Sequence, residues 1–492
     1  MGLRRAAPSR DGRARPPSAP AAVKRSAGRM ERDSLGVKRV PASAYYGIQT
    51  QRAVENFPIS GLRMPVEMVR AYALIKKAAA AANAQVGWLS RREALAIQRA
   101  CDEVLQGRFD EHFVVDVYQA GAGTSFNMNM NEVLANRANE WLGSRRGRYR
   151  PLHPNDHVNM GQSTNDTFPT AIRLAGLMML PGLRSAMREL EAELQRKAVA
   201  FASIVKAGRT HLQDAVPVRL GGEFGAYAHA VRKAAAHVAH EAGALNELPL
   251  GGTAVGTGMN AHPRSRALAL RLLKRWTGFP LRPGEHLMER LQSLADVARV
   301  SGQLRAYALE LIRIANDLRL LSSGPHTGFA ELELPAIQPG SSIMPGKVNP
   351  VVPEMVDMVC FQVVGHDATV AMATQAGQLE LNVMMPVAAY NLLQAMRLLT
   401  QASRVFATRC VAGITANAER CEEFAHRSLA LVTALAPRIG YLNAAMAAKE
   451  SLKTGRPIVE LVAAHRWLDP AVAKRLLDPV RLSRSVGPVR RP

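Results

Sequence analysis

The sequence predicts an all-α protein organised around a long helical bundle, and three features of its 492 residues support this prediction. From residue 64 onward, Ala- and Leu-rich stretches dominate, while the apolar–polar alternation of half-buried strands is scarce. One amphipathic run is also too long for a helix of a single small domain, so it needs neighbours of similar length. Hydrophobic residues make up 48% of the chain and charged residues 21%, which allows a sizeable core and excludes disorder of the whole chain.

The longest amphipathic run begins after Pro283-Gly284 and ends before Gly324-Pro325. Its apolar residues recur in steps of three and four, as they do on one face of a helix. These residues are Leu287, Leu291, Leu294, Val297, Val300, Leu304, Tyr307, Leu311, Ile314, Leu318 and Leu321. A continuous helix of this extent would be roughly 55 Å long.

Comparable helices are predicted at about 166–205, 219–246 and 353–385. Placed side by side, these helices form a long bundle. Apolar stripes left on the outside of such a bundle favour association with other copies of the chain. The sequence therefore predicts an oligomer.

Five polar, glycine-rich segments are predicted as loops between the helices. They are residues 119–131, 153–167, 208–222, 249–260 and 335–350. Connectors in a helical bundle need few residues, so loops of this length favour a functional role. Their side chains are mainly neutral hydrogen-bond donors with one lysine, a composition suited to binding carboxylates or phosphate. The donors are Thr124, Ser125, Asn127, Ser163, Thr164, Asn165, Thr210, His211, Ser341, Ser342, Lys347 and Asn349.

The chain is strongly basic, with a formal net charge of +23. Residues 1–30 contain eight basic and one acidic side chain but few large apolar residues, so they are predicted to form a disordered basic extension. They lack the apolar core of a secretory signal. An organellar transit peptide and a start codon placed upstream of Met30 both agree with this composition, and we favour the second. The sequence has no RGG tract or zinc finger, so nucleic-acid binding is not expected.

The four cysteines, Cys101, Cys360, Cys410 and Cys421, include no CxxC pair, and the 13 histidines include no HExxH spacing. A metal site is therefore not predicted. Buried, reduced cysteines are typical of cytoplasmic proteins, and we expect this chain to act in the cytoplasm. No apolar run approaches the roughly 18 residues of a membrane-spanning helix, so no association with a membrane is expected.

The segment GSSIMPGKVNP at residues 340–350 resembles the signature of the aspartase/class II fumarase superfamily. Four further blocks resemble the same family in the same order. They are GAGTSFNMNMNEVLANRA at 121–138, HPNDHVNMGQSTND at 153–166, GRTHLQDAVPVRLG at 208–221 and GGTAVGTGMN at 251–260. The resemblance covers about residues 31–480.

This resemblance implies a small N-terminal domain at 31–165, a central helical bundle at 166–410 and a small C-terminal helical domain with a tail at 411–492. It also implies a homotetramer in which three subunits contribute to each active site. The implied activity is the reversible removal of ammonia from L-aspartate, which gives fumarate and needs no cofactor. A fumarate hydratase and a lyase of an N-substituted aspartate are the alternatives.

The resemblance also assigns roles to the polar residues of the loops. Ser341 is the base that removes the β-proton, and Lys347 together with neighbouring backbone N–H groups favours its alkoxide form. His211 and Asn165 lie near the leaving amine. The β-carboxylate and the aci-carboxylate intermediate are bound by Thr124, Ser163, Thr164 and Ser342. The α-carboxylate is bound by Thr210, Lys347 and Asn349.

The leaving group is indicated by smaller motifs, which do not all agree. Those that resemble aspartases are Ala122-Gly123-Thr124-Ser125, Ser163-Thr164-Asn165-Asp166, Gln338-Pro339-Gly340, Tyr45-Tyr46-Gly47 and Gly377-Gln378-Leu379-Glu380-Leu381-Asn382. Gly251-Gly252-Thr253 is closer to a fumarase, while Gln375 and Met385-Pro386 replace acidic residues expected in an aspartase. On balance the motifs favour ammonia as the leaving group.

Overall fold

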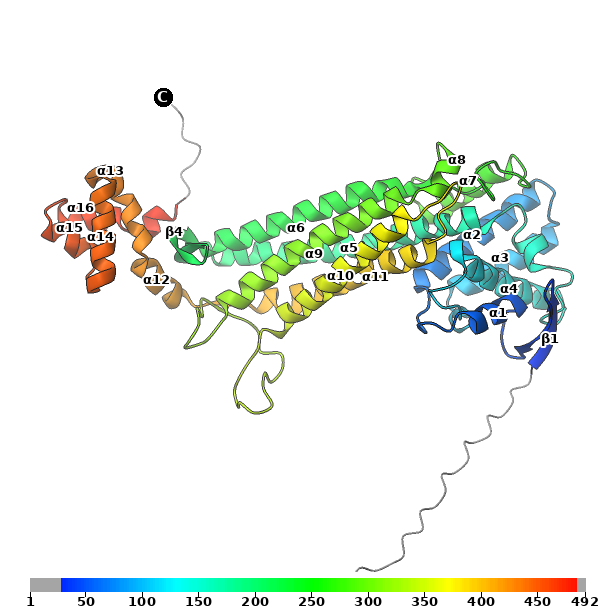
Figure 1. Ribbon diagram of the computed structural model, residues 1–492, viewed down its shortest axis with the longest axis horizontal. Coiled ribbons are helices and arrows are strands. Elements are labelled where there is room, and N and C mark those ends of the chain that lie inside the picture. The colour runs from blue at the N-terminus through cyan, green and yellow to red at the C-terminus, as the bar shows by residue number, and fades with distance from the viewer. Residues whose placement is uncertain (1–27, 485–492) are drawn as a thin grey trace, which may run out of the picture.

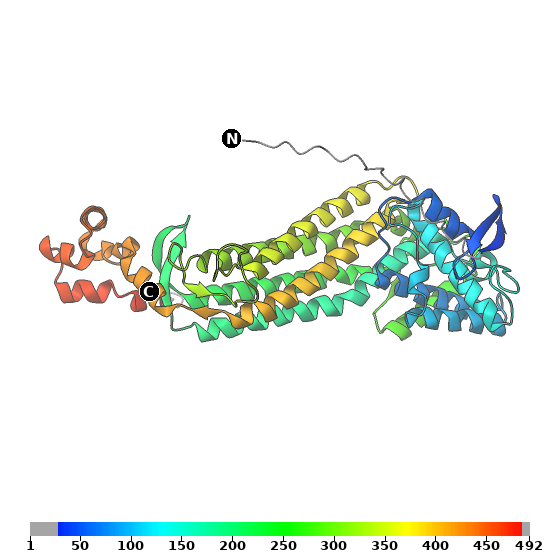
Figure 2. The ribbon, with the colours of Figure 1, turned by 90° about the horizontal axis from the view of Figure 1, so that it is seen from below.

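A computed structural model describes residues 28–484 as a long helical bundle with smaller helical regions at its two ends (Figure 1). Within these residues, five long helices lie side by side (Figures 1 and 2). They are α5 (Thr164–Ala200), α6 (Leu220–Ala242), α9 (Ala295–Leu321), α10 (Val351–Gln375) and α11 (Met385–Arg409). We call these five helices the central bundle. The predicted all-α fold class is confirmed.

One end of the central bundle is surrounded by shorter helices. They are α1 (Ile48–Asn56), α2 (Val66–Gln85), α3 (Arg91–Leu105), α4 (Thr124–Trp141), α7 (Ser265–Thr277) and α8 (Leu287–Gln292). The rings of Tyr72, Phe126 and Phe168 meet edge to face, with centroids 5.5, 6.0 and 6.2 Å apart. Because these rings belong to α2, α4 and α5, their contacts fix the three helices against one another.

The opposite end of the central bundle carries the C-terminal helices (Figure 1). They are α12 (Ala418–Arg427), α13 (Ala436–Ile439), α14 (Tyr441–Thr454), α15 (Ile458–Ala464), α16 (Pro470–Leu476) and α17 (Pro479–Leu482). These helices enclose an apolar cluster of their own, which includes Leu431, Leu435, Val462 and Ala473.

The strands in the described part of the chain form small two-stranded sheets. β1 (Gly28–Asp33) with β2 (Gly36–Pro41), β3 (Val205–Thr210) with β4 (Gln213–Arg219), and β7 (Leu332–Glu333) with β8 (Thr415–Ala416) are antiparallel. β5 (Glu247–Leu248) is parallel to β6 (Arg282–Pro283). Short helical turns occur at Asp110–His112, Gly121–Gly123, Pro154–Val158, Gly243–Asn246, Val411–Gly413 and Leu429–Ala434.

A buried ion pair connects α5 to α9. Arg173 is 0% exposed and donates from Nε and Nη2 to the two carboxylate oxygens of Asp296, at 2.8 and 3.0 Å. Arg290 of α8 donates to the same carboxylate at 3.1 Å. Two guanidinium groups therefore compensate one buried carboxylate at the junction of three helices.

Two of the predicted long helices are interrupted. The run expected to be continuous to Leu321 breaks at Ser293, because this residue is extended and its hydroxyl accepts a hydrogen bond from the Ala295 backbone at the start of α9. The helix predicted at 353–385 ends at Gln375. There the Asn382 amide donates to the carbonyls of Ala373 and Thr374, at 2.9 and 3.2 Å, and so completes the hydrogen bonds of the helix end.

Two of the predicted loops are largely regular structure. Residues 124–131 form the start of α4, since Asn127 and Asn131 are one helical turn apart and both are buried. Residues 208–222 form most of the β3–β4 hairpin and the start of α6. The helix predicted at 166–205 ends at Ala200, before β3. The loop at 335–350 is irregular, as predicted.

The basic extension predicted at 1–30 lies mostly outside the described residues. Its last three residues are not disordered but belong to β1. The reason is that the Arg29 guanidinium donates to the carbonyls of Pro41, Ala44 and Tyr46 at 3.0, 2.7 and 2.7 Å. The predicted domain boundaries at residues 165 and 410 stay a prediction.

The four cysteines are free and buried, as predicted. Burial raises the pKa of Cys360, Cys410 and Cys421 to about 12, so these thiols stay protonated at neutral pH. Among residues 28–484, no helix combines the length and the apolar character that crossing a membrane requires.

Candidate active site

The first turns of α4 and α5 bring four of the predicted binding residues into one region. Thr124 is the first residue of α4, Ser163 is the N-cap of α5, and Thr164 and Asn165 follow it. The two helix starts are in contact, since the Asn127 amide of α4 donates to the Thr164 hydroxyl at 2.9 Å. Helix N-termini present unpaired backbone N–H groups, so this region suits a carboxylate. We call it the helix-start group.

Gly123 allows the two helix starts to approach. It has φ of +84°, and a Cβ atom at this position would lie 2.1 Å from the Phe168 ring of α5. Glycine is therefore required here both by the backbone conformation and by the space. The preceding Ala122 donates its N–H to the Val383 carbonyl at 2.8 Å, which attaches this turn to the segment before α11.

Asp166, which is not among the predicted site residues, fixes a further loop over the start of α5. Its buried carboxylate accepts hydrogen bonds from the backbone N–H groups of Ser163, Gly251 and Thr253, at 3.0, 2.9 and 3.1 Å. Asn165 donates to the Ala254 carbonyl at 2.8 Å. The loop at 249–260 therefore covers the helix-start group. The signal for Asp166 was its spacing from Ser163, which matches a capping box.

Thr210 and His211 lie at the tip of the β3–β4 hairpin. His211 and Leu212 have φ of +55° and +59°, so the two-residue turn is left-handed at both positions without a glycine. Such a conformation is strained for these residues. Both Thr210 and His211 are exposed. The strained turn and the exposed side chains of Thr210 and His211 favour a role in binding another molecule.

Buried charges hold the hairpin in place, and no sequence motif indicated them. Glu331 is 0% exposed, and Arg209 donates to both of its carboxylate oxygens at 2.9 and 3.0 Å. Lys206 lies 3.4 Å from the same carboxylate and 2.9 Å from Glu223. The Arg209 guanidinium also stacks on the ring of Phe329, 4.3 Å from its centroid. Because Glu331 precedes the loop at 335–350, these contacts tie that loop to the hairpin.

The loop at 335–350 carries the predicted base. The Ser341 hydroxyl oxygen accepts hydrogen bonds from the backbone N–H groups of Ile343 and Met344, at 3.2 and 2.9 Å. Two N–H groups directed at one oxygen stabilise negative charge on it, which is what an alkoxide requires. Asn349 closes the loop by donating to the Gly340 carbonyl at 2.5 Å.

The two other predicted residues of this loop face solvent. Ser342 and Lys347 are exposed, and the structure gives the Lys347 ammonium no hydrogen-bond or ion-pair partner within residues 28–484. An exposed, unpaired cation on a glycine-containing loop is free to move towards an anion.

The predicted site residues do not form one cavity within a single chain. α5 contains 37 residues, and a helix of this length spans roughly 55 Å. The helix-start group lies at the beginning of α5, whereas the β3–β4 hairpin follows its end, as the positions of α4 and β4 in Figure 1 show. The loop at 335–350 leads into α10 at the end nearer to β4 (Figure 1). The Thr164 hydroxyl and the Ser341 hydroxyl of one chain are therefore far apart.

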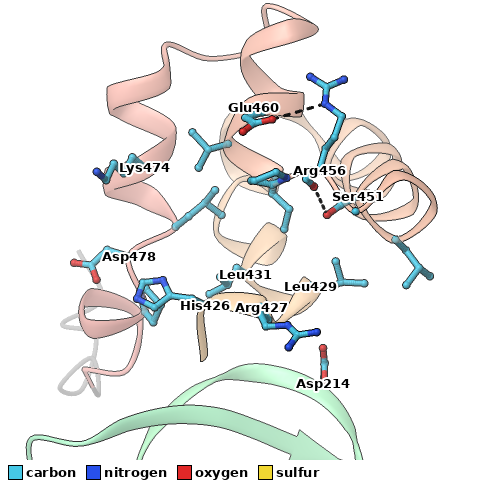
Figure 3. A pocket seen from close by; sticks show the side chains of 17 residues that line it. Asp214, His426, Arg427, Leu429, Leu431, Ser451, Arg456, Glu460, Lys474 and Asp478 are labelled. Carbon is cyan, nitrogen blue, oxygen red and sulfur yellow. Dashed lines mark hydrogen bonds and ion pairs between the residues drawn. The ribbon is translucent and has the colours of Figure 1, made fainter. Parts of the chain in front are cut away.

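A cavity of about 900 Å³ lies between β4 and the C-terminal helices (Figure 3). Asp214 of β4 lines it on one side. Arg427 of α12, Lys474 of α16 and Arg456 of the turn between α14 and α15 line it on the other. Its lining combines charges of both signs with leucine, isoleucine and valine side chains. No predicted site residue lines this cavity.

The part of the chain that the structure describes contains no group of three or more His, Cys, Asp or Glu side chains placed to hold a metal ion.

Comparisons with known proteins agree with this arrangement of motifs. A sequence model of a family described as lyase matches residues 36–365, and one described as fumarase C C-terminus matches residues 431–484. The chain belongs to the aspartase/class II fumarase superfamily of lyases. The family predicted from the motifs is thereby confirmed.

Individual members of this superfamily are similar over almost the whole chain. An aspartate ammonia-lyase from Pseudomonas fluorescens is 49% identical over 447 residues, which are 90% of this chain and 94% of that protein. The solved structure of a fumarate lyase:delta crystallin from Brucella melitensis has a TM-score of 0.89 at 49% identity and covers 93% of this chain and 100% of its own. A class II fumarase from Schistosoma mansoni has a TM-score of 0.91 at 38% identity, with 93% and 99% covered.

Proposed function

We propose that this chain is an aspartate ammonia-lyase, which converts L-aspartate reversibly to fumarate and ammonia. The observation that carries the proposal is the similarity to aspartate ammonia-lyases from several bacteria, at 46%, 47% and 49% identity over 88–90% of the chain. The geometry of the Ser341 loop supports it, because a base strong enough to remove a carbon-bound proton needs a stabilised alkoxide.

The reaction begins with the removal of the β-proton by the Ser341 oxygen. The electron pair of the broken C–H bond moves onto the β-carboxylate, which becomes a dianionic aci-carboxylate. Thr124, Ser163 and Thr164, at the starts of α4 and α5, would hold this charge together with Ser342. The electron pair then returns to form the carbon–carbon double bond while the C–N bond breaks.

The other end of the substrate is held by a second set of groups. Lys347, Asn349 and Thr210 would bind the α-carboxylate, while Asn165 and His211 would lie near the amine that leaves as ammonia. Removing one donor to a developing oxyanion costs about 10²–10³ in rate, so several donors together account for a large part of the acceleration. The ammonium of Lys347 also favours the ionised form of Ser341 when the loop closes.

These groups would meet only in an assembly of several subunits. We propose a homotetramer in which three subunits supply each site, as the resemblance implied. Met358, Phe361 and Met372 of α10 support association, since they are 63%, 60% and 64% exposed in the single chain. Large apolar side chains exposed along one helix mark an interface.

The proposed reaction is tested by supplying L-aspartate and L-malate separately to the purified protein and following fumarate by its ultraviolet absorbance. We expect fumarate to form from L-aspartate and not at a comparable rate from L-malate. The second candidate, fumarate hydratase, is favoured by the similarity to the Schistosoma mansoni fumarase. Turnover of L-malate alone would replace the first proposal with the second.

The shared site is tested by mixing two inactive variants. Thr164→Ala lies in the helix-start group and Ser341→Ala in the loop at 335–350, and these groups come from different subunits in the proposal. Random co-assembly of the two variant chains is expected to restore about one quarter of the sites, because half of the subunits can supply each intact group. Activity measured after co-expression checks this expectation.

The matched control mixes Ser341→Ala with Ser342→Ala. Both changes are in the same loop, so no chain in this mixture supplies an intact loop. Recovery in the first mixture only is the expected result. Equal behaviour of the two mixtures contradicts the shared site.

We place the protein in the cytoplasm. The support is that Cys101, Cys360, Cys410 and Cys421 are all free and buried, a state typical of a reducing compartment.

A further inference from the structure

Lys76 of α2 is a buried cation that the proposed mechanism does not use. Its side chain is 0% exposed, and its ammonium donates to the Asn159 side-chain oxygen at 2.9 Å. Within residues 28–484 the structure gives this ammonium no carboxylate in ion-pair contact. Burying an ammonium without a paired carboxylate is costly, so a purely structural role for Lys76 is a poor explanation.

A chain of hydrogen bonds leads from Lys76 to the helix-start group. The Asn159 oxygen also accepts hydrogen bonds from the side-chain amides of Asn127 and Asn131, both at 3.3 Å. The Asn127 amide in turn donates to the Thr164 hydroxyl oxygen at 2.9 Å. Because this oxygen accepts a hydrogen bond, its own hydrogen is available to donate. Among the described residues, the structure shows no acceptor for it.

The network also contains unpaired acceptors. The side-chain oxygens of Asn127 and Asn131 are buried and have no hydrogen-bond partner. The amide nitrogens of both residues contact Asn159, so the two residues lie on one face of α4.

We propose that Lys76 is a positioning residue for the dicarboxylate substrate: its ammonium orients Asn159 and Asn127 so that the Thr164 hydroxyl donates to the substrate, and its charge attracts the substrate carboxylate. This proposal rests on the proposed function, since it takes Thr164 as a carboxylate-binding group. It adds a buried charge from α2, a helix that none of the predicted motifs includes.

The groups around Lys76 determine the pH below which its side chain is charged. Burial lowers the pKa of Lys76 to about 7, against the attraction of Asp166 on α5. Burial raises the pKa of the Cys101 thiol on α3, so this neighbour is neutral at pH 7. Burial raises the pKa of Asp166 to about 6. The Tyr72 ring, on α2 itself, has its centroid 5.7 Å from the ammonium, and the groups from α4 are neutral amides. A bound dianion favours the charged form of Lys76.

The test compares Lys76→Met with Lys77→Met. Lys77 is the adjacent residue, but its ammonium pairs with Asp102 at 2.6 Å and lies 4.8 Å from the centroid of the Trp276 ring, so it does not join the network. Calorimetric titration of the full-length protein with fumarate is expected to give a Kd about 10- to 50-fold higher for Lys76→Met than for the wild type, and a change within about twofold for Lys77→Met.

Thermal unfolding separates positioning from a structural role. Lys76→Met removes a buried charge without creating a large cavity, so its Tm is expected to equal or exceed that of the wild type. A structural role predicts a lower Tm with unchanged affinity in the folded protein. Lys76→Gln keeps a hydrogen-bond donor without the charge, and it is expected to show an intermediate Kd; it also provides the measurement if Lys76→Met does not fold.

The pH dependence gives a further readout. As the pH rises through about 7, Lys76 loses its positive charge, so fumarate binding by the wild type is expected to weaken over this range. Lys76→Met should lack this step and keep only the step that belongs to Asp166, whose pKa rises further once the Lys76 charge that lowers it is gone. Equal Kd values for Lys76→Met and Lys77→Met overturn the proposal. Fumarate is the product of both candidate reactions, so its binding does not depend on which reaction is catalysed. A wild-type protein that binds fumarate but does not convert L-aspartate contradicts the proposed function and leaves this inference standing.

Discussion

Replacing Ser341 with alanine is expected to lower kcat for L-aspartate by about 10²–10⁴-fold, the range that a general base supplies. The Ser341 oxygen is the acceptor of two backbone N–H groups, and an alanine at this position has no atom that could take the β-proton. Steady-state measurement of fumarate formation at saturating L-aspartate gives the change in kcat.

Two controls show that the loss of activity arises in the chemical step and not from a change in folding or assembly. Size-exclusion chromatography should give the same oligomer for Ser341→Ala and the wild type, because the loop is not part of the buried core. Ser322→Ala removes another serine hydroxyl, which donates to the Arg319 carbonyl at 3.3 Å near the end of α9, and should retain near-normal activity. A Ser341→Ala enzyme with a rate close to that of the wild type removes Ser341 from the mechanism.

The sequence predicted the central bundle because apolar periodicity is a local signal. The stripe from Val297 to Leu321 on α9 is buried throughout, as expected for one helix face. The break at Ser293 could not be predicted in the same way, because Leu291 and Leu294 continue the periodicity across it. The helix is interrupted by the extended backbone of Ser293 and by the hydrogen bond that its hydroxyl accepts from Ala295, rather than by a change of pattern.

The candidate site was predicted unevenly for a similar reason. The loop at 335–350 could be predicted from the sequence because its glycines and prolines break regular structure. Asn127 and Asn131 were assigned to a loop because they are polar, although burial in a hydrogen-bonded network places them on a helix. The pair of Arg209 and Glu331 joins residues 122 positions apart, and no local pattern predicts such a contact. The proposed assembly of the site across subunits was predicted from the resemblance alone.

The largest effect on stability is expected from Asp296→Ala. This change leaves the guanidinium of Arg173 buried between α5 and α9 without its partner carboxylate. Arg290 loses the same partner. Breaking a buried ion pair in this way costs about 3–5 kcal/mol, since the remaining charge has neither water nor a counter-ion. Unfolding by denaturant, at one fixed protomer concentration because association adds to stability, measures the loss.

Two further variants show whether the loss of stability comes from the uncompensated buried charge or from the loss of an ion pair as such. Glu310→Ala removes a pair on the same helix, in which Arg313 lies 2.9 Å from Glu310, but both side chains are more than 40% exposed, so a change below about 1 kcal/mol is expected. In the double variant Arg173→Met with Asp296→Leu, the buried charges of this pair are replaced by apolar groups, and stability should recover part of the loss. If the double variant is less stable than Asp296→Ala, the uncompensated charge of Arg173 is not the cause. In that case the Arg173 side chain stabilises α5 through its hydrogen bond to the Pro169 carbonyl of the same helix, at 3.0 Å, and not through Asp296.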